Sequence, residues 1–145
     1  MNIFLDYQKK ILNNLKKLEK KKIISIPKGF KGITVELPPQ KENSAISCNA
    51  ALLLSKHNNI SSIELAQILK KHLLKAFKEF KTIDVAGPGF LNINFETYFW
   101  LENLLTIIKL NKNYGSSKSR KKKYNIEFVS ANPTGPLHVG HCRGA

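Results

Sequence analysis

The chain has 145 residues, of which 24 are basic and 10 acidic, giving a formal net charge of +14 at pH 7. This length allows one domain with its own core and no more than the beginning of a second. Apolar residues form 42% of the chain, an ordinary share for a globular protein, and their short runs predict no membrane span. Two cysteines are too few for a disulfide scaffold and favour a reducing, cytoplasmic location.

The positive charge lies almost entirely in the first part of the chain. Residues 1–123 contain 23 basic and nine acidic residues, whereas residues 124–145 carry one of each and are neutral. Of the basic residues, 22 are lysines, which act as point charges suited to phosphate contacts. This distribution predicts a polyanionic partner. The charge alone is equally consistent with a lysine-rich composition whose side chains are simply solvated.

The first third of the chain predicts a helix, then a strand. Residues 1–22 form an amphipathic pattern with a basic end, which is typical of a helix C-terminus. Residues 23–26 fit a short strand or a turn. Alternation over residues 33–37 indicates a half-buried strand, which two prolines end. The main apolar stripe of the helix contains Phe4, Ile11, Leu15 and Leu18.

Two further helices are predicted next. Residues 44–57 are largely apolar and rich in alanine, which favours a helix packed closely on a sheet. Ser61 and Glu64 have capping-box spacing, so a third helix is expected from there to about Phe80. The residues expected to face the core from the third helix are Ile63, Ala66, Leu69, Leu73, Ala76, Phe77 and Phe80.

Residues 83–86 and 90–95 are predicted strands, joined by a Gly-Pro-Gly turn. Thr97 is placed to cap a fourth helix that ends near Leu110. The order of elements predicts an α+β domain over residues 1–110, with a small antiparallel sheet and about four helices, mostly on one face. Residues 111–123 combine Gly, Ser and basic residues and are predicted to be a linker.

The last 22 residues form a strand, loop and helix pattern. Residues 126–129 fit a buried strand, and two prolines and a glycine within residues 133–136 require a loop. A helix is expected to open near His138. His138 and His141 would then share one face beside free N–H groups and the positive end of the helix dipole, which suits a triphosphate. Gly140 would let a nucleotide approach the backbone.

Other interpretations of these residues are open. Two surface histidines and ordinary turn residues would give the same short HxxH spacing. Cys142 follows the histidines, but this set lacks further ligands, so no metal site is expected.

The string from Glu127 to Ala145, with His138-Val139-Gly140-His141 after a strand and a Pro/Gly loop, resembles class I aminoacyl-tRNA synthetases, and the arginyl-tRNA synthetases in particular. The resemblance implies an arginine–tRNA ligase, in which the arginine carboxylate attacks the α-phosphate of ATP and the protein supplies positioning and charge stabilisation. Residues 124–145 would then be the first strand and loop of a Rossmann-like catalytic domain, and so short a piece is expected to be inactive alone.

The resemblance also implies roles for individual residues. His138 and His141 would be catalytic and would bind ATP together with Gly140, with Mg²⁺ present only as the counterion of the nucleotide. The arginine pocket would contain Glu127, Ser130 and Asn132.

A weaker resemblance covers residues 33–95. Segments Ser47–Ala51 and Val85–Asn92 are similar to the appended N-terminal domain of the arginyl family, which contacts the D-loop side of tRNA. It implies that Phe90, Asn92 and Asn94 contact tRNA, although Phe90 would fit a core position equally well. The implied partners are tRNA(Arg), arginine and ATP, and a monomer is expected.

Two other functions compete with this interpretation. The chain could be a stand-alone basic RNA-binding module with a vestigial tail. It could also be a different HxGH nucleotidyltransferase that acts on a small molecule, but the context of residues 132–136 argues against that class.

Overall fold

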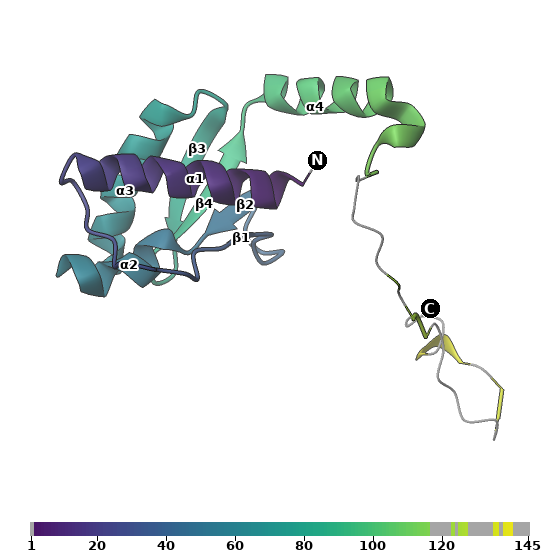
Figure 1. Ribbon diagram of the computed structural model, residues 1–145, viewed down its shortest axis with the longest axis horizontal. Helices are drawn as coiled ribbons and strands as arrows, with labels where there is room; N and C mark the ends of the chain where they lie inside the picture. The colour runs from purple at the N-terminus through teal and green to yellow at the C-terminus, as the bar shows by residue number, and fades with distance from the viewer. Residues whose placement is uncertain (1, 117–122, 124, 128–134, 137, 141–145) are drawn as a thin grey trace. The chain divides into compact units, whose positions relative to one another are not determined.

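The computed structural model describes residues 2–116, 123, 125–127, 135–136 and 138–140. The chain divides into two compact units, Met1–Tyr114 and Gly115–Ala145. The first unit is an α+β domain, as the sequence predicted (Figure 1). Its elements are α1 (Ile3–Lys20), β1 (Val35–Glu36), β2 (Ile46–Cys48), α2 (Ala50–Asn58), α3 (Ser62–Ala76), β3 (Phe80–Ala86), β4 (Phe90–Phe95), α4 (Thr97–Leu110) and a 3₁₀ turn (Asn111–Asn113).

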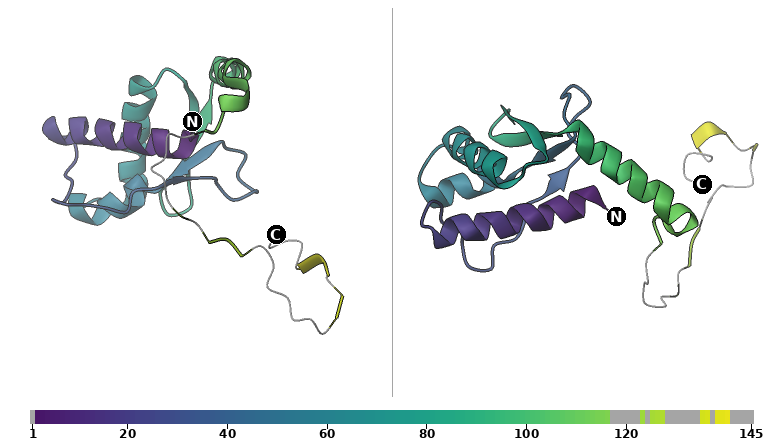
Figure 2. Two further views of the ribbon diagram at one scale, coloured as in Figure 1. Left: turned by 45° about the vertical axis from the view of Figure 1, so that its right-hand side comes forward. Right: turned by 90° about the horizontal axis from the view of Figure 1, so that it is seen from above.

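The four strands form one antiparallel sheet in the order β1-β2-β4-β3. Helices α1, α2 and α3 pack on one face of this sheet (Figures 1 and 2). Because successive strand residues point to opposite faces, alternate residues of β2 and β4 enter the core. The buried members of these two strands on the helix side are Ile46, Cys48, Leu91, Ile93 and Phe95.

Helix α1 buries the stripe that the sequence predicted, with Ile11, Leu15 and Leu18 in the core and Phe4 packed at its edge. Asn2 caps the helix, because its side chain accepts a hydrogen bond from the Leu5 N–H at 3.2 Å. These contacts join the first helix of the chain to the rest of the domain.

An aromatic cluster closes the end of the core beside the start of β3. The Tyr7 ring lies 4.8 Å from the Phe95 ring and 5.4 Å from the Phe80 ring, between centroids. The Tyr7 hydroxyl donates to Glu79 at 2.9 Å. Burial, reinforced by this carboxylate, raises the pKa of Tyr7 above its ordinary value, so the hydroxyl stays a neutral donor.

The predicted helix over residues 44–57 is wrong in its first part. Residues Ile46–Cys48 form β2, in the interior of the sheet, and α2 begins only at Ala50. Strand β2 pairs with β1 on one side and β4 on the other, and Ala45 N–H donates to the Ile93 carbonyl at 3.1 Å. Pairing with strands distant in sequence therefore overrides the local preference for a helix.

Other boundaries also differ from the prediction. Helix α3 has the predicted capping box, but it ends at Ala76, because Phe77 is extended and Phe80 already belongs to β3. Ile63 and Ala76 are exposed, and Leu65 is buried in their place. Residues 23–26 form no strand, and the strand predicted over residues 33–37 contains only Val35–Glu36.

The start of α4 also differs from the prediction. Glu96, not Thr97, is its N-cap residue, and it makes no side-chain capping bond. The helix therefore begins at Thr97, and its end at Leu110 is the one predicted.

In the second unit, Ile126 and Glu127 are not in a strand, although the sequence predicted one over residues 126–129. A strand needs a neighbour to satisfy its backbone groups. Residues 128–134 of the predicted strand and loop lie outside the described part. Val139 and Gly140 have helical geometry, where the sequence predicted that a helix opens.

Within the described residues, no helix is both long and apolar enough to cross a membrane.

The turn between β3 and β4 provides a stability test. Gly89 has φ +118°, and a Cβ there would lie 2.9 Å from the Ser62 carbonyl oxygen, whereas Gly87 has φ +50° and open space around it. We expect Gly89→Ala to lower the free energy of unfolding by about 2–3 kcal/mol, and Gly87→Ala by about 1 kcal/mol. Urea unfolding of the two variants measures this difference, and equal losses would contradict the close approach of the turn to α3.

Candidate nucleic-acid interface

The sheet face opposite the helices carries a row of polar side chains. Glu36 pairs with Ser47, Ser47 with Asn92, and Asn92 with Asp84, so these four residues lie side by side across all four strands. Their side chains point away from the helical layer because of the alternation along each strand. This open face is therefore built by the same register that buries the core.

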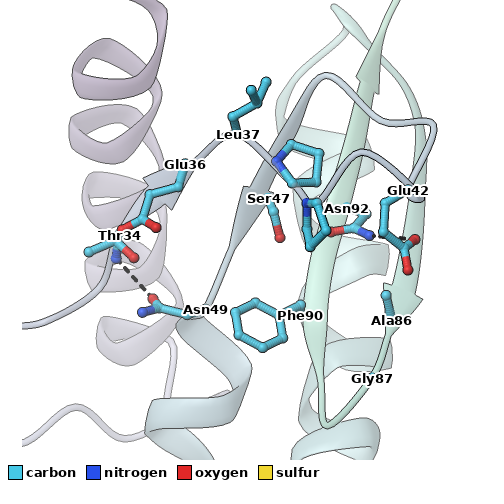
Figure 3. Close-up of a pocket in the computed structure, with 12 residues that line it drawn as sticks. Thr34, Glu36, Leu37, Glu42, Ser47, Asn49, Ala86, Gly87, Phe90 and Asn92 are labelled. Carbon is cyan, nitrogen blue, oxygen red and sulfur yellow. Dashed lines mark hydrogen bonds between the residues drawn. The ribbon is translucent and has the colours of Figure 1, made fainter. Parts of the chain in front are cut away.

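A hollow of about 500 Å³ lies on the open face (Figure 3). Residues of the segment after β1 form one wall, and the β3–β4 turn forms another. The residues lining it are Thr34, Glu36, Leu37, Pro38, Pro39, Glu42, Ser47, Asn49, Ala86, Gly87, Phe90 and Asn92. We call this hollow the sheet pocket.

Asn92 is the buried polar group of the sheet pocket, with only 2% of its surface exposed. Its Nδ2 donates to Glu42 Oε2 at 3.0 Å, whereas its Oδ1 is buried and has no hydrogen-bond partner. Leaving a buried acceptor unpaired costs about 1–3 kcal/mol, so native structures seldom tolerate it without a reason. The Asn92 oxygen is therefore a buried, unsatisfied acceptor in the lining of the pocket.

Phe90 lies two residues before Asn92 on the same face of β4 and also lines the sheet pocket. It is half-buried and stands outside the hydrophobic core, so the core position that the sequence also allowed is excluded. Figure 3 shows its ring standing in the hollow beside Asn49. An accessible ring of this kind can stack on a flat group.

Asn94 has a different position from the other two predicted tRNA contacts. Its Oδ1 accepts from Ala45 N–H at 3.1 Å, and its Nδ2 donates to the Asn43 carbonyl at 3.2 Å. These bonds attach the segment before β2 to the sheet, and Asn94 does not line the sheet pocket.

Asn49 lines the sheet pocket beside Phe90 and connects it to the segment before β1. Its Oδ1 accepts from Thr34 N–H at 2.9 Å, and its Nδ2 donates to the Gly32 carbonyl at 3.2 Å. Asn49 and Asn94 therefore fix the segments before β1 and before β2 through their side-chain hydrogen bonds.

The charge of the sheet pocket favours donors over phosphates. Its lining includes two carboxylates, Glu36 and Glu42, and no lysine or arginine. A phosphate would be repelled, whereas a flat group with N–H donors would meet carboxylates, an amide oxygen and an aromatic ring. The pocket therefore suits a nucleobase better than a nucleic-acid backbone.

Two polar residues that line this pocket, Ser47 and Glu42, were not predicted to be site residues. Ser47 was hidden because its segment was predicted to be helical, although a polar residue between Ile46 and Cys48 has the alternation of a strand. Glu42 comes from an irregular loop, and nothing local predicts that it meets Asn92 from 50 residues away.

The second unit contains the other predicted site residues. His138, Gly140 and Glu127 are exposed, and Gly140 N–H donates to His138 Nδ1 at 3.1 Å. A Cβ on residue 140 would lie 2.9 Å from His138 Cε1, so the glycine leaves room for the imidazole over the backbone. His141, Ser130 and Asn132 lie outside the described residues. In the described part, no cluster of three or more His, Cys, Asp or Glu side chains could hold a metal.

Comparison with known proteins agrees with this architecture. The family model for the arginyl tRNA synthetase N terminal domain matches residues 5–95, which defines the class as aminoacyl-tRNA synthetases. The match covers more than half of the chain and spans the whole sheet. The chain belongs to the family of arginyl-tRNA synthetases.

Individual relatives extend the likeness over the whole chain. It is 46% identical to the arginine–tRNA ligase of Pelagibacter ubique and 40% identical to that of Brucella suis, over 146 residues in each case. These alignments cover all of this chain and 25% of each relative, so the chain spans about a quarter of their length. The arginyl-tRNA synthetase structure of Thermus thermophilus shares the fold, with a TM-score of 0.51 and 22% identity over 99% of this chain and 21% of that one.

Cys48 lies behind the sheet pocket, on the helix side of β2, and reports whether the sheet is intact. Burial raises the pKa of its thiol to about 11, so the folded protein keeps it neutral and inaccessible. The pKa of Cys48 is higher in the folded than in the unfolded protein, so ionisation of the thiol favours unfolding. The contribution of Cys48 to the free energy of unfolding is therefore complete below the pKa of the unfolded thiol and is lost as the pH rises towards about 11. In a Cys142→Ser background, we expect Cys48 to react with a disulfide reagent at about pH 8 only after unfolding. Rapid labelling in the native state would contradict the buried position.

Proposed function

We propose that the chain is the N-terminal part of an arginine–tRNA ligase, which activates arginine with ATP and transfers it to tRNA(Arg) in the cytoplasm. The observation that carries the proposal is the 46% identity to a curated arginine–tRNA ligase across all 145 residues, including the segment with the His138–His141 signature. Since the relatives are about four times longer, these residues alone are expected to be inactive. We also propose that the chain is a monomer.

The sheet pocket is proposed to bind a nucleobase from the D-loop region of the tRNA. The base would stack on Phe90 and would donate an N–H to the orphaned Oδ1 of Asn92, while Glu42 holds the other end of the Asn92 amide. Both features suit single-stranded or loop nucleotides, whose bases can be splayed out and read on their edges. Asn94 would act by positioning the adjacent segment.

The lysines are proposed to contact phosphates outside the pocket. The lining of the pocket lacks cations, whereas residues 1–123 carry the whole net charge of the chain. Phosphate contacts supply sequence-independent affinity, and the base contact supplies selectivity. The predicted linker, with Lys118, Lys121, Lys122 and Lys123, is one source of such contacts.

The catalytic role of the tail is proposed from the family signature. His138 and His141 would contact ATP and stabilise its phosphates in the transition state, with Mg²⁺ as the nucleotide's counterion. Gly140 would let the nucleotide lie against the backbone, and its contact with His138 is consistent with a compact signature loop. Glu127, Ser130 and Asn132 would contact arginine, and a carboxylate is a suitable partner for its guanidinium.

The alternative function, a stand-alone RNA-binding module, would use the same sheet pocket but no ATP. A chimera distinguishes the two: these 145 residues replace the aligned quarter of the Pelagibacter ubique enzyme. Arginine–tRNA ligation by the chimera supports the ligase, whereas a folded chimera that binds tRNA without ligation favours the module.

The sheet pocket gives a prediction about RNA affinity. We expect Phe90→Ala to weaken tRNA binding by the 145-residue chain by about five-fold or more, because base–aromatic stacking contributes about 1–3 kcal/mol. Asn92→Ala should act in the same direction, and Tyr98→Ala, which removes an exposed ring outside the pocket, should have little effect. Fluorescence anisotropy over a range of salt concentrations measures this.

The same titration separates base contacts from phosphate contacts. The pocket variants should leave the salt dependence unchanged, whereas replacing Lys118, Lys121, Lys122 and Lys123 by alanine should flatten it by about 0.9 in log–log slope for each phosphate contact that the substitutions remove. Wild-type affinity in the Phe90→Ala variant would overturn the pocket assignment.

A second prediction concerns the chimera. His138→Ala and His141→Ala should each slow ATP–pyrophosphate exchange by about 10²–10³, because each removes a transition-state contact. Asn132→Ala should instead raise the KM for arginine, since its amide would contact the amino acid. Full exchange rates in both histidine variants would refute their assignment to the phosphates. The unfused 145-residue chain is the negative control.

A further inference from the structure

Helix α4 is apolar but almost entirely exposed. A surface helix normally turns its apolar side to its own domain and its polar side to solvent. Of the 14 residues of α4, only Phe99 is buried, although the helix is the most apolar of the four described α-helices. Figures 1 and 2 show α4 leaving the end of β4 and projecting away from the sheet and the other helices.

Polar residues of α4 line a hollow near the start of the helix, although most of them are exposed. Beside the aromatic cluster, a hollow of about 400 Å³ separates the helix from α1 and the start of β3. Lys10 pairs with Glu79 across 3.5 Å in this hollow. The polar residues that line it from the two sides are Tyr7, Lys10, Glu79, Glu102, Asn103 and Thr106.

The outward side of α4 carries an aliphatic stripe. Leu101, Leu104, Leu105 and Ile108 are spaced i, i+3, i+4 and i+7, which places them on one side of a helix with about 100° between successive residues. Their exposed fractions are 56%, 52%, 65% and 64%. This spacing is typical of a helix packed on a core, so the exposure shows that the domain itself does not supply the partner. We call these four residues the α4 stripe.

We propose that the α4 stripe is the surface on which the catalytic domain of the ligase packs, so that α4 is a shared structural element of two domains. The proposal rests on the ligase function proposed above and adds the partner of this surface. Docking of α4 would orient the sheet pocket relative to the ATP site.

The length of the relatives supports this occupant. The chain corresponds to about a quarter of the Pelagibacter ubique enzyme, so three quarters of a protein of that length lie outside the structure. Among the described residues, α4 is the last α-helix before the segment that carries the His138–His141 signature, so the stripe lies close in sequence to the catalytic domain. Tethering gives such a domain a high effective concentration, and a small apolar surface is then sufficient for docking.

Other occupants fit the stripe less well. RNA is contacted through cations and aromatic rings, whereas the α4 stripe is aliphatic, and Lys109 falls on the polar side of the helix by the same spacing. A second copy would need a larger surface, because stable interfaces between separate chains use about 20–30 residues a side.

Hydroxyl-radical footprinting of wild-type side chains tests the proposal. We expect oxidation of Leu104, Leu105 and the neighbouring Trp100 to fall several-fold in the chimera relative to the 145-residue chain. Ile63, an exposed aliphatic residue of α3 with 53% exposure, is the internal reference and should not change. Equal oxidation of the α4 stripe in the two proteins would overturn the proposal.

A variant pair provides an independent measurement. Leu104→Asn/Leu105→Asn should lower the Tm of the chimera by several degrees but leave that of the 145-residue chain almost unchanged, because exposed positions contribute little. Ile63→Asn is the matched control and should have the same small effect in both proteins. A double variant that is silent in the chimera would also contradict docking.

The remaining outcomes identify a different occupant. Protection already present in the 145-residue chain, together with a doubled mass in sedimentation, would assign the stripe to a second copy. Protection that appears only on addition of tRNA would assign it to RNA. Either result overturns the proposal. Ligation activity of the chimera is scored separately, so an active chimera with an exposed stripe rejects the docking surface and leaves the ligase function standing.

Discussion

The alternation of side chains along β4 is the constraint on which the rest of the domain depends. Leu91, Ile93 and Phe95 enter the core beneath the helices, and the residues between them form the open face. A slip of one residue in register would bury the polar set and expose the apolar one. The packing of α1, α2 and α3 and the shape of the sheet pocket therefore have a common origin.

The open face also carries a stability cost that its function would explain. Asn92 is almost completely buried, yet its oxygen has no partner and its nitrogen bonds to a loop carboxylate. A domain selected for stability alone would place a satisfied or apolar side chain there. Retaining an unsatisfied amide beside an accessible ring is understandable if a ligand completes the hydrogen bonds, and selectivity then follows because a ligand without the donor leaves the group unpaired.

Two surfaces of the domain are incomplete in different ways. The sheet pocket lacks a hydrogen-bond donor, whereas the α4 stripe lacks an apolar partner. A missing hydrogen-bond donor suits a partner that binds and dissociates, because hydrogen bonds can be exchanged with water. An uncovered aliphatic stripe such as that of α4 suits a permanent partner, because exposed aliphatic surface promotes association in water. This contrast agrees with the proposals that the domain binds tRNA transiently and belongs to a larger enzyme.

The sequence by itself determined the features that depend on nearby residues. The apolar stripe of α1, the capping box at Ser61, the Gly-Pro-Gly turn and the extent of α4 are local patterns, and the α+β class follows from their order. The signature string also pointed to the family, because its residues are contiguous in the chain and many positions match at once.

Only the tertiary structure decided the rest. Ile46–Cys48 became a strand because Cys48 pairs with Leu91, and Glu42 reached Asn92 across 50 residues. The sequence predicted an apolar α4 but not its exposure, because the spacing of a helix defines its sides and only the fold decides whether a neighbour covers them. Such long-range pairings leave no local periodicity, so reasoning from windows of sequence cannot find them.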